Sequence, residues 1–163
     1  GTRTGTIDPS VLDFVAKKEG LGVHELIEIL NKKSGYLGVA GKSDARDVRA
    51  LQAEGNYEAD LILRMQEKKI CDYFSSYYGY MGGCDILVFT AGIGEKSPQT
   101  RLHVCQRLEE AFGIQIDEEA NQVWGEVRVI SKPTSKVKVI VIPTNEELMI
   151  AREVMSFKKA LSK

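Results

Sequence analysis

One stretch decides the fold of this chain: Asp85-Ile86-Leu87-Val88-Phe89-Thr90-Ala91-Gly92-Ile93-Gly94-Glu95-Lys96-Ser97-Pro98. Its first six residues are largely apolar, which predicts a strand covered on both faces. The glycines at positions 92 and 94 predict a turn where the backbone can approach a ligand closely. Ser97-Pro98 predicts a helix start, and a helix N-terminus favours anionic ligands. The stretch therefore predicts an α/β protein in which a strand ends in a candidate ligand site or in a plain tight turn.

The C-terminal half continues the pattern of alternating strands and helices. A helix from Ser97 should end at Gly113, followed by a short helix over about residues 118–123. Strands are expected over residues 127–131 and 137–142, and a last helix follows Pro143-Thr144-Asn145. Residues 84–163 thus predict the order strand, helix, strand, strand, helix around a mixed sheet.

The N-terminal half, residues 1–83, is expected to be a mostly helical insertion. Asp8-Pro9-Ser10 predicts one helix start, and Ser43 or Asp44 can cap another. The longest helix is expected over residues 57–80, which contain five of the six tyrosines. Some of these tyrosines are expected to pack on the core or on a partner surface.

Composition limits the possible classes of protein. The chain has 163 residues, of which 43% are apolar and 28% charged, as in a globular domain. A net charge of -1 gives no reason to expect binding to nucleic acid or to a membrane surface. The three cysteines lack CxxC spacing and predict buried free thiols in a reducing cytoplasm. The first residues resemble no signal peptide and include no Met, so the chain is expected to begin within a longer protein.

Several short segments could carry chemistry, and each has a plain structural alternative. Asp44 could bind ribose hydroxyls and Arg46 a base or phosphate, or both could belong to a capped, solvated helix start. Glu146 could bind magnesium, or could simply suit a first helical turn. Arg3, between glycines, could neutralise a phosphoryl group or lie in a frayed terminus. Gly41-Lys42-Ser43 is not a P-loop, because position 36 is Tyr where the motif needs Gly.

Taken together, these segments resemble the acetokinase family. The matching stretches are Gly1-Thr2-Arg3-Thr4-Gly5-Thr6-Ile7-Asp8-Pro9, Leu30-Asn31-Lys32-Lys33-Ser34-Gly35, Ser43-Asp44-Ala45-Arg46-Asp47-Val48, Val88-Phe89-Thr90-Ala91-Gly92-Ile93-Gly94-Glu95 and Ile142-Pro143-Thr144-Asn145-Glu146-Glu147-Leu148-Met149-Ile150-Ala151-Arg152. The resemblance implies the C-terminal part of a nucleotide-binding domain with a ribonuclease-H-like mixed sheet and flanking helices. The family belongs to the superfamily of acetate and sugar kinases, heat-shock chaperones and actin.

The resemblance also implies an activity, which is reversible phosphoryl transfer between ATP and acetate to give ADP and acetyl phosphate. It implies that Arg3 stabilises the transition state and that Glu146 binds Mg²⁺. The implied nucleotide contacts are Asp44, Ala45, Arg46, Gly92, Ile93, Gly94, Glu95 and Lys96. It further implies a cytoplasmic homodimer whose phosphate loop, catalytic Asp and carboxylate-binding residues lie upstream of Gly1. This chain alone is therefore expected to be inactive.

Other functions stay open at this point. Propionate and butyrate kinases are close relatives of acetate kinases, so the carboxylate is less certain than the family. A non-catalytic nucleotide-binding or dimerisation module is a second class. An actin-like or chaperone-like ATPase is disfavoured by the segment Pro143-Thr144-Asn145-Glu146-Glu147.

Overall fold

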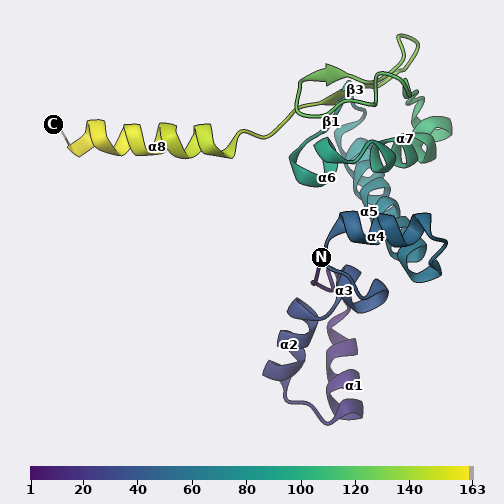
Figure 1. Cartoon of the computed structure of the whole chain (residues 1–163), viewed down its shortest axis with the longest axis vertical. Helices are drawn as coiled ribbons and strands as arrows, with labels where there is room; N and C mark the ends of the chain where they lie inside the picture. The colour runs from purple at the N-terminus through teal and green to yellow at the C-terminus, as the bar shows by residue number, and fades with distance from the viewer. Residues whose placement is uncertain (162–163) are drawn as a thin grey trace. The chain divides into compact units, whose positions relative to one another are not determined.

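The computed structural model describes residues 1–161, which form two compact units, one over Gly1–Lys69 and one from Ile70 onward. Figure 1 labels the elements along the chain. The boundary between the units falls inside one long helix, α5 (Tyr57–Met81). This helix lies where the sequence places its longest helix, over residues 57–80.

The first unit is helical. It contains α1 (Pro9–Glu19), α2 (Val23–Lys32), α3 (Gly35–Ala40), α4 (Ala45–Ala53) and the first part of α5. Two of its helix starts follow from local sequence. Asp8 caps α1 by accepting the Ser10 N–H, and Asp44 caps α4 by accepting the Arg46 N–H. Its small core consists of Tyr36, Val48, Ala59, Ile62 and Leu63.

The second unit contains a three-stranded mixed sheet. The strands are β1 (Ile86–Phe89), β2 (Arg128–Val129) and β3 (Lys138–Val141), in the order β1-β3-β2. β1 and β3 are parallel, with Ile86 opposite Lys138 and Phe89 opposite Val141, whereas β2 pairs with β3 antiparallel. The connection from β1 to β3 includes α6 (Ala91–Lys96) and α7 (Pro98–Phe112). The predicted α/β class with a mixed sheet and flanking helices is therefore confirmed.

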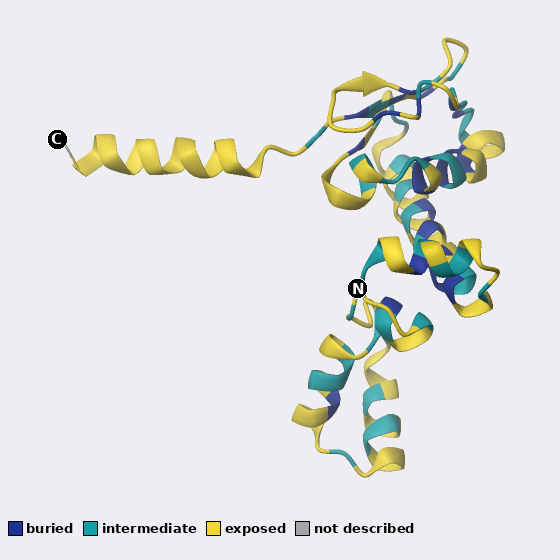
Figure 2. Cartoon of the chain, in the orientation of Figure 1, coloured by how far each residue is buried: buried dark blue, intermediate teal, exposed yellow. Residues whose placement is uncertain are grey.

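The core of the second unit covers one face of this sheet. Phe89, Val139 and Val141 are buried together with Val104 and Leu108 of α7 (Figure 2). Cys71 and Cys105 are buried free thiols, as predicted, whereas Cys84 is only half-buried.

The other face of the sheet differs from the prediction. Ile86 and Val88 of β1 are 48% and 43% exposed, and Val129 of β2 is 47% exposed. The prediction that β1 is covered on both faces is therefore wrong. Ile86 and Val88 lie on a face of the sheet that no other described residue buries.

The predicted helix over residues 118–123 is also wrong. The chain makes a single turn there, in which the Asn121 N–H donates to the Asp117 carbonyl at 2.9 Å. The carbonyls of Asn121 and Val123 accept from the Arg101 guanidinium, at 2.6 and 3.0 Å, so they are not free to continue a helix.

The last helix, α8 (Glu146–Leu161), starts where the sequence predicts and has no buried residue (Figure 2). Its exposed apolar residues include Leu148, Ile150, Val154 and Phe157. No helix within residues 1–161 has both the length and the apolar composition required to cross a membrane.

Candidate functional site

Backbone hydrogen bonds hold the N-terminal segment in place. The Thr4 N–H donates to the Leu30 carbonyl at 2.9 Å, and the Ser34 N–H donates to the Thr2 carbonyl at 2.8 Å. Gly35 is needed for this close approach, because its φ is +60° and an added Cβ would lie 2.9 Å from the Arg3 carbonyl oxygen. Arg3 is therefore carried by an anchored segment, and its side chain is exposed.

This segment lies beside the start of α4. A Cβ on Gly1 would lie 2.8 Å from the carbonyl oxygen of Ser43, which immediately precedes Asp44. The first unit therefore brings the N-terminal glycine close to the helix start at Asp44. Ala45 is half-buried and packs against the core of this unit.

Asp44 and Arg46 form a two-point ion pair. Arg46 Nε donates to Asp44 Oδ1 at 3.0 Å and Nη2 to Oδ2 at 2.7 Å, while the Arg46 backbone N–H also donates to Oδ1 at 2.8 Å. These hydrogen bonds lower the pKa of Asp44 to about 2, so the carboxylate is charged at neutral pH. Because a carboxylate has roughly four acceptor positions, about one stays available to a ligand hydroxyl. The Arg46 side chain is 90% exposed and presents its charge to solvent.

A buried ion pair holds α4 against α5. Arg49 Nη2 donates to Glu67 Oε1 at 2.9 Å, and the Glu67 side chain is only 2% exposed. Arg49 also donates to Gln52, which in turn donates to Asp60 of α5 at 2.8 Å. This polar network fixes the helix whose first turn carries Asp44 and Arg46.

In the second unit, the predicted glycine-rich turn is a short helix, α6. Its two glycines have different roles. A Cβ on Gly94 would lie 3.1 Å from the Phe89 carbonyl carbon, whereas a Cβ on Gly92 would meet no heavy atom within 4 Å. A side chain at Gly94 would therefore crowd the Phe89 backbone, whereas Gly92 borders open space. Ile93, between them, is 45% exposed, and Lys96 is exposed at the end of the helix.

The turn before α8 contacts both ends of α6. The Thr144 hydroxyl accepts the Ala91 N–H at 2.9 Å, and the Thr144 N–H donates to Glu95 Oε2 at 3.1 Å. The Glu95 carboxylate is thus used inside the protein, and its side chain is 12% exposed. Asn145 Oδ1 accepts the Leu148 N–H at 2.9 Å and caps α8, which leaves Glu146 exposed at its first position.

These two turns lie at the same edge of the sheet. β1 and β3 are parallel neighbours, so α6 and the residues around Thr144 both follow the carboxyl ends of their strands. Crevices at such edges are common ligand sites in α/β proteins. The predicted residues of the second unit, from Gly92 to Lys96 and Glu146, therefore gather around this edge.

Two further residues, Thr144 and Arg101, are not among the predicted site residues. Arg101 is fully buried and donates all its side-chain hydrogen bonds to oxygens of residues 94, 95, 121 and 123. Burial lowers its pKa, opposed by the nearby Cys105 thiol. Thr144 acts on Ala91, 53 residues away, and Arg101 acts on Asn121, 20 residues away, so no local motif marks these contacts.

The donor set suits a magnesium ion that is shared with phosphate. No group of three or more metal-binding side chains occurs within residues 1–161, so a site made entirely by protein is not formed there. Mg²⁺ is commonly bound by one or two carboxylates together with substrate phosphates and water. The exposed Glu146 carboxylate, at the same edge as α6, fits that mode.

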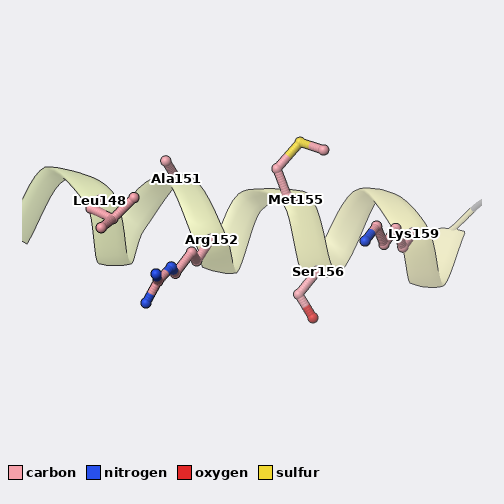
Figure 3. A pocket seen from close by; sticks show the side chains of 6 residues that line it. All are labelled: Leu148, Ala151, Arg152, Met155, Ser156 and Lys159. Carbon is pink, nitrogen blue, oxygen red and sulfur yellow. The ribbon is translucent and has the colours of Figure 1, made fainter.

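A groove on α8 does not have the geometry of a ligand-binding site. About 460 Å³ of space is lined by Leu148, Ala151, Arg152, Met155, Ser156 and Lys159, all from this one helix. Figure 3 shows that Ala151 and Met155 point to one side and Arg152 and Ser156 to the other. These side chains do not converge on a common ligand.

The fold and the two turns define an α/β protein with a candidate anion site at the carboxyl ends of two parallel strands. The sequence profile of the acetokinase family matches residues 1–152. The chain is 49% identical over 155 residues to the acetate kinase of Fervidobacterium nodosum, covering 94% of this chain and 38% of that protein. This chain therefore belongs to the acetokinase family.

Solved structures agree with this assignment. The Porphyromonas gingivalis acetate kinase matches with a TM-score of 0.87 and 46% identity, over 95% of this chain and 39% of that one. A propionate kinase from Francisella tularensis matches with a TM-score of 0.85 and 37% identity, over 93% of this chain and 38% of that one. The chain thus spans about two fifths of the length of these relatives.

Proposed function

We propose that this chain supplies the nucleotide- and metal-binding part of a kinase that transfers a phosphoryl group between ATP and a short carboxylate. The observation that carries the proposal is the pair of turns, β1–α6 and β3–α8, at one edge of the sheet in a chain of the acetokinase family. Acetate is the proposed carboxylate, because the relatives include proteins named acetate kinase at close to half identity.

Nucleotide contacts are proposed for each unit from its own geometry. In the first, the Arg46 guanidinium and the free acceptor position of Asp44 face solvent beside Ala45. In the second, Gly92 borders open space and Ile93 is exposed, which suits an apolar base beside the backbone. Gly94, Glu95 and Lys96 are proposed to contribute chiefly through the backbone, since Gly94 has no side chain and the Glu95 carboxylate is held by Thr144.

Glu146 is the proposed ligand for Mg²⁺ bound to the nucleotide phosphates. When bound, the metal neutralises charge on these phosphates. Glu146 suits this role because it is exposed and because Asn145, not Glu146, caps α8. The carboxylate is therefore not used by the fold.

Arg3 is the proposed cation for the phosphoryl group in flight. A guanidinium stabilises the charge spread over the phosphoryl oxygens, and such transfers depend mainly on positioning and charge. The hydrogen bonds of the N-terminal segment limit the backbone conformations of Arg3, and its side chain is exposed to solvent.

The remaining catalytic groups are proposed to lie in a preceding part of the same protein. In this account, residues 1–163 form the C-terminal part of the nucleotide-binding domain. The uncovered apolar face at Ile86, Val88 and Val129 supports a further layer of structure on this side of the sheet.

We also propose that the enzyme is a cytoplasmic homodimer. The exposed, stacked pair Tyr73 and Tyr77 on α5 is a candidate contact between the two subunits.

Acyl phosphate formation tests the proposal directly. The intact protein should form acetyl phosphate from ATP, Mg²⁺ and acetate, trapped as the hydroxamate, and should use propionate and butyrate less well. The 163-residue chain alone should give only background. Absence of product from every short carboxylate would reject the kinase, whereas product from the isolated chain would reject the proposed division of the site.

The second candidate is a nucleotide-binding or dimerisation module without catalysis. It is favoured by the same stacked tyrosines, whose side chains are 51% and 60% exposed. The two candidates differ in the assay above, because a module would bind ATP or dimerise without forming an acyl phosphate.

A further inference from the structure

Thr144 joins the two turns that form the candidate site. Its hydroxyl oxygen accepts the backbone N–H of Ala91 at 2.9 Å and lies 3.2 Å from the Thr90 hydroxyl. Its own N–H donates to the carboxylate of Glu95 at 3.1 Å. One exposed threonine therefore holds both the beginning and the end of α6.

The beginning of α6 requires such a contact. Ala91 has φ of 55°, the single positive value found on a residue other than glycine within residues 1–161. This region is uncommon for a residue with a Cβ, and it persists only where the surroundings impose it. Because the Ala91 N–H points at the Thr144 hydroxyl, this hydrogen bond stabilises the strained backbone.

Arg101 also holds the C-terminal end of α6. Its Nη1 donates to the carbonyls of Gly94 and Glu95 at 2.9 and 2.8 Å. Carbonyls in the last turn of a helix have no partner within the helix, so these two need an outside donor. The remaining N–H groups of Arg101 donate to the side-chain and backbone oxygens of Asn121 and to the Val123 carbonyl, at 2.6 to 3.0 Å.

The Arg101 guanidinium is buried without a charged partner among the described residues, which costs free energy. Its side chain is fully buried, and all five hydrogen bonds go to uncharged oxygens. A buried charge without a charged partner is less favourable than an apolar side chain of similar size. The planar group with five donors instead fixes several backbone segments at once, which an apolar side chain cannot do.

We infer that Thr144 and Arg101 are positioning residues that hold α6 in a fixed geometry for nucleotide binding. The inference rests on the nucleotide site under Proposed function. Glu146 follows Thr144 by two residues, so the same contacts anchor the backbone just before the residue proposed for the metal. Neither positioning residue needs to touch the nucleotide.

Thr144→Val tests this arrangement without creating a cavity. Valine has nearly the shape of threonine but cannot accept the Ala91 N–H, and the site is exposed, so folding should be retained. Thr144→Ser keeps the hydroxyl and should behave as the wild type. Thr134→Val is the matched control, because Thr134 is also exposed and its hydroxyl donates to Gln115 instead, at 2.6 Å.

Two readouts on the intact protein separate positioning from general stability. Loss of one hydrogen bond should speed amide exchange at Ala91 about fivefold to tenfold. It should raise the Kd for ATP with Mg²⁺ by a similar factor of about five to ten. The KM for the carboxylate should not change, and Thr134→Val should change none of the three quantities.

The possible failures are distinguishable. Unchanged exchange in Thr144→Val would overturn the positioning role, and faster exchange with an unchanged Kd would overturn its importance for the nucleotide. An equal effect of Thr144→Ser would show that the hydroxyl is not responsible, and so would also overturn the inference. A wild-type protein that binds no ATP would overturn the proposed function itself, whatever the exchange shows.

Discussion

The two glycines of α6 give opposite predictions for stability. Neither has a positive φ, so alanine is compatible with the backbone at both positions. At Gly92 a Cβ would meet no atom within 4 Å, whereas at Gly94 it would lie 3.1 Å from the Phe89 carbonyl carbon and 3.4 Å from its Cα. Both of those neighbours are backbone atoms, which cannot rotate away.

The magnitudes follow from these distances. Alanine is favoured over glycine in a helix interior by about 1 kcal/mol, and near a helix end we expect roughly half of that. Gly92→Ala should therefore raise the free energy of unfolding by about 0.5 kcal/mol. At Gly94 the same gain is opposed by overpacking of about 1–3 kcal/mol, so Gly94→Ala should lower the free energy of unfolding by about 1 kcal/mol.

Nucleotide binding should change in a different order. If the space beside Gly92 receives the nucleotide, a methyl group there obstructs it. We expect the Kd of Gly92→Ala for ATP with Mg²⁺ to rise about tenfold, equivalent to about 1.4 kcal/mol. Gly92→Ala would then be more stable than the wild type and yet bind less well, which a general loss of structure cannot produce.

Thermal unfolding and isothermal titration of the same preparations test this pair. For a protein of this size, 1 kcal/mol corresponds to about 2–4 °C in Tm. Wild-type ATP affinity in a stable Gly92→Ala protein would refute the assignment of α6 to the nucleotide. Equal stability of the two variants would refute the packing argument for Gly94.

Three further predictions concern buried and paired groups. Arg49→Met should lower the free energy of unfolding by about 3 kcal/mol in urea titrations, because it removes a partner of the buried Glu67, and the double variant with Glu67→Met should recover part of the loss. Burial raises the pKa of Cys105 to about 12. The native thiol should therefore resist alkylation at pH 8. The contribution of the protonated thiol to the free energy of unfolding should be present below about pH 9 and decline from there towards pH 12. Hydrogen bonds from Arg46 lower the pKa of Asp44 to about 2. The contribution of this carboxylate to the free energy of unfolding should therefore be present above about pH 4 and decline as the pH falls towards 2. Asp44→Ala should lose this acid dependence in circular dichroism titrations.

Local chemistry accounts for the parts of the fold that the sequence predicted. Asp8 and Asp44 cap their helices through N–H groups two residues away, and α5 is long enough for its pattern to be clear. The strands β1 and β3 are short apolar runs beside turn residues. In each case the determining contacts lie within a few residues of one another.

The errors and omissions involve contacts between distant residues. α6 contains two glycines and has weak helix propensity, but Arg101 and Thr144 hold its two ends. Thr144 is 53 residues from Ala91, so its role cannot be recognised from spacing. The expected helix over residues 118–123 fails for the same reason, since Asn121 is held by Arg101.

The candidate site was predicted less completely than the fold. Residue types identified Asp44, Arg46 and Glu146 only as possible ligands, because each also suits the start of a helix. The structure shows Asp44 as the cap of α4 and as the partner of an exposed Arg46, and its contact with a nucleotide stays a prediction. It also shows that Glu95 has an internal partner, which its sequence context did not indicate.

The most direct test of the account is titration of the intact protein with ATP, with and without Mg²⁺, in the wild type and in Glu146→Ala. Mg²⁺ should tighten ATP binding to the wild type, and this gain should be lost in Glu146→Ala. Arg46→Ala should weaken ATP binding whether or not Mg²⁺ is present. Absence of binding to the wild type, or binding that neither substitution changes, would contradict the assignment of these residues to a nucleotide and metal site.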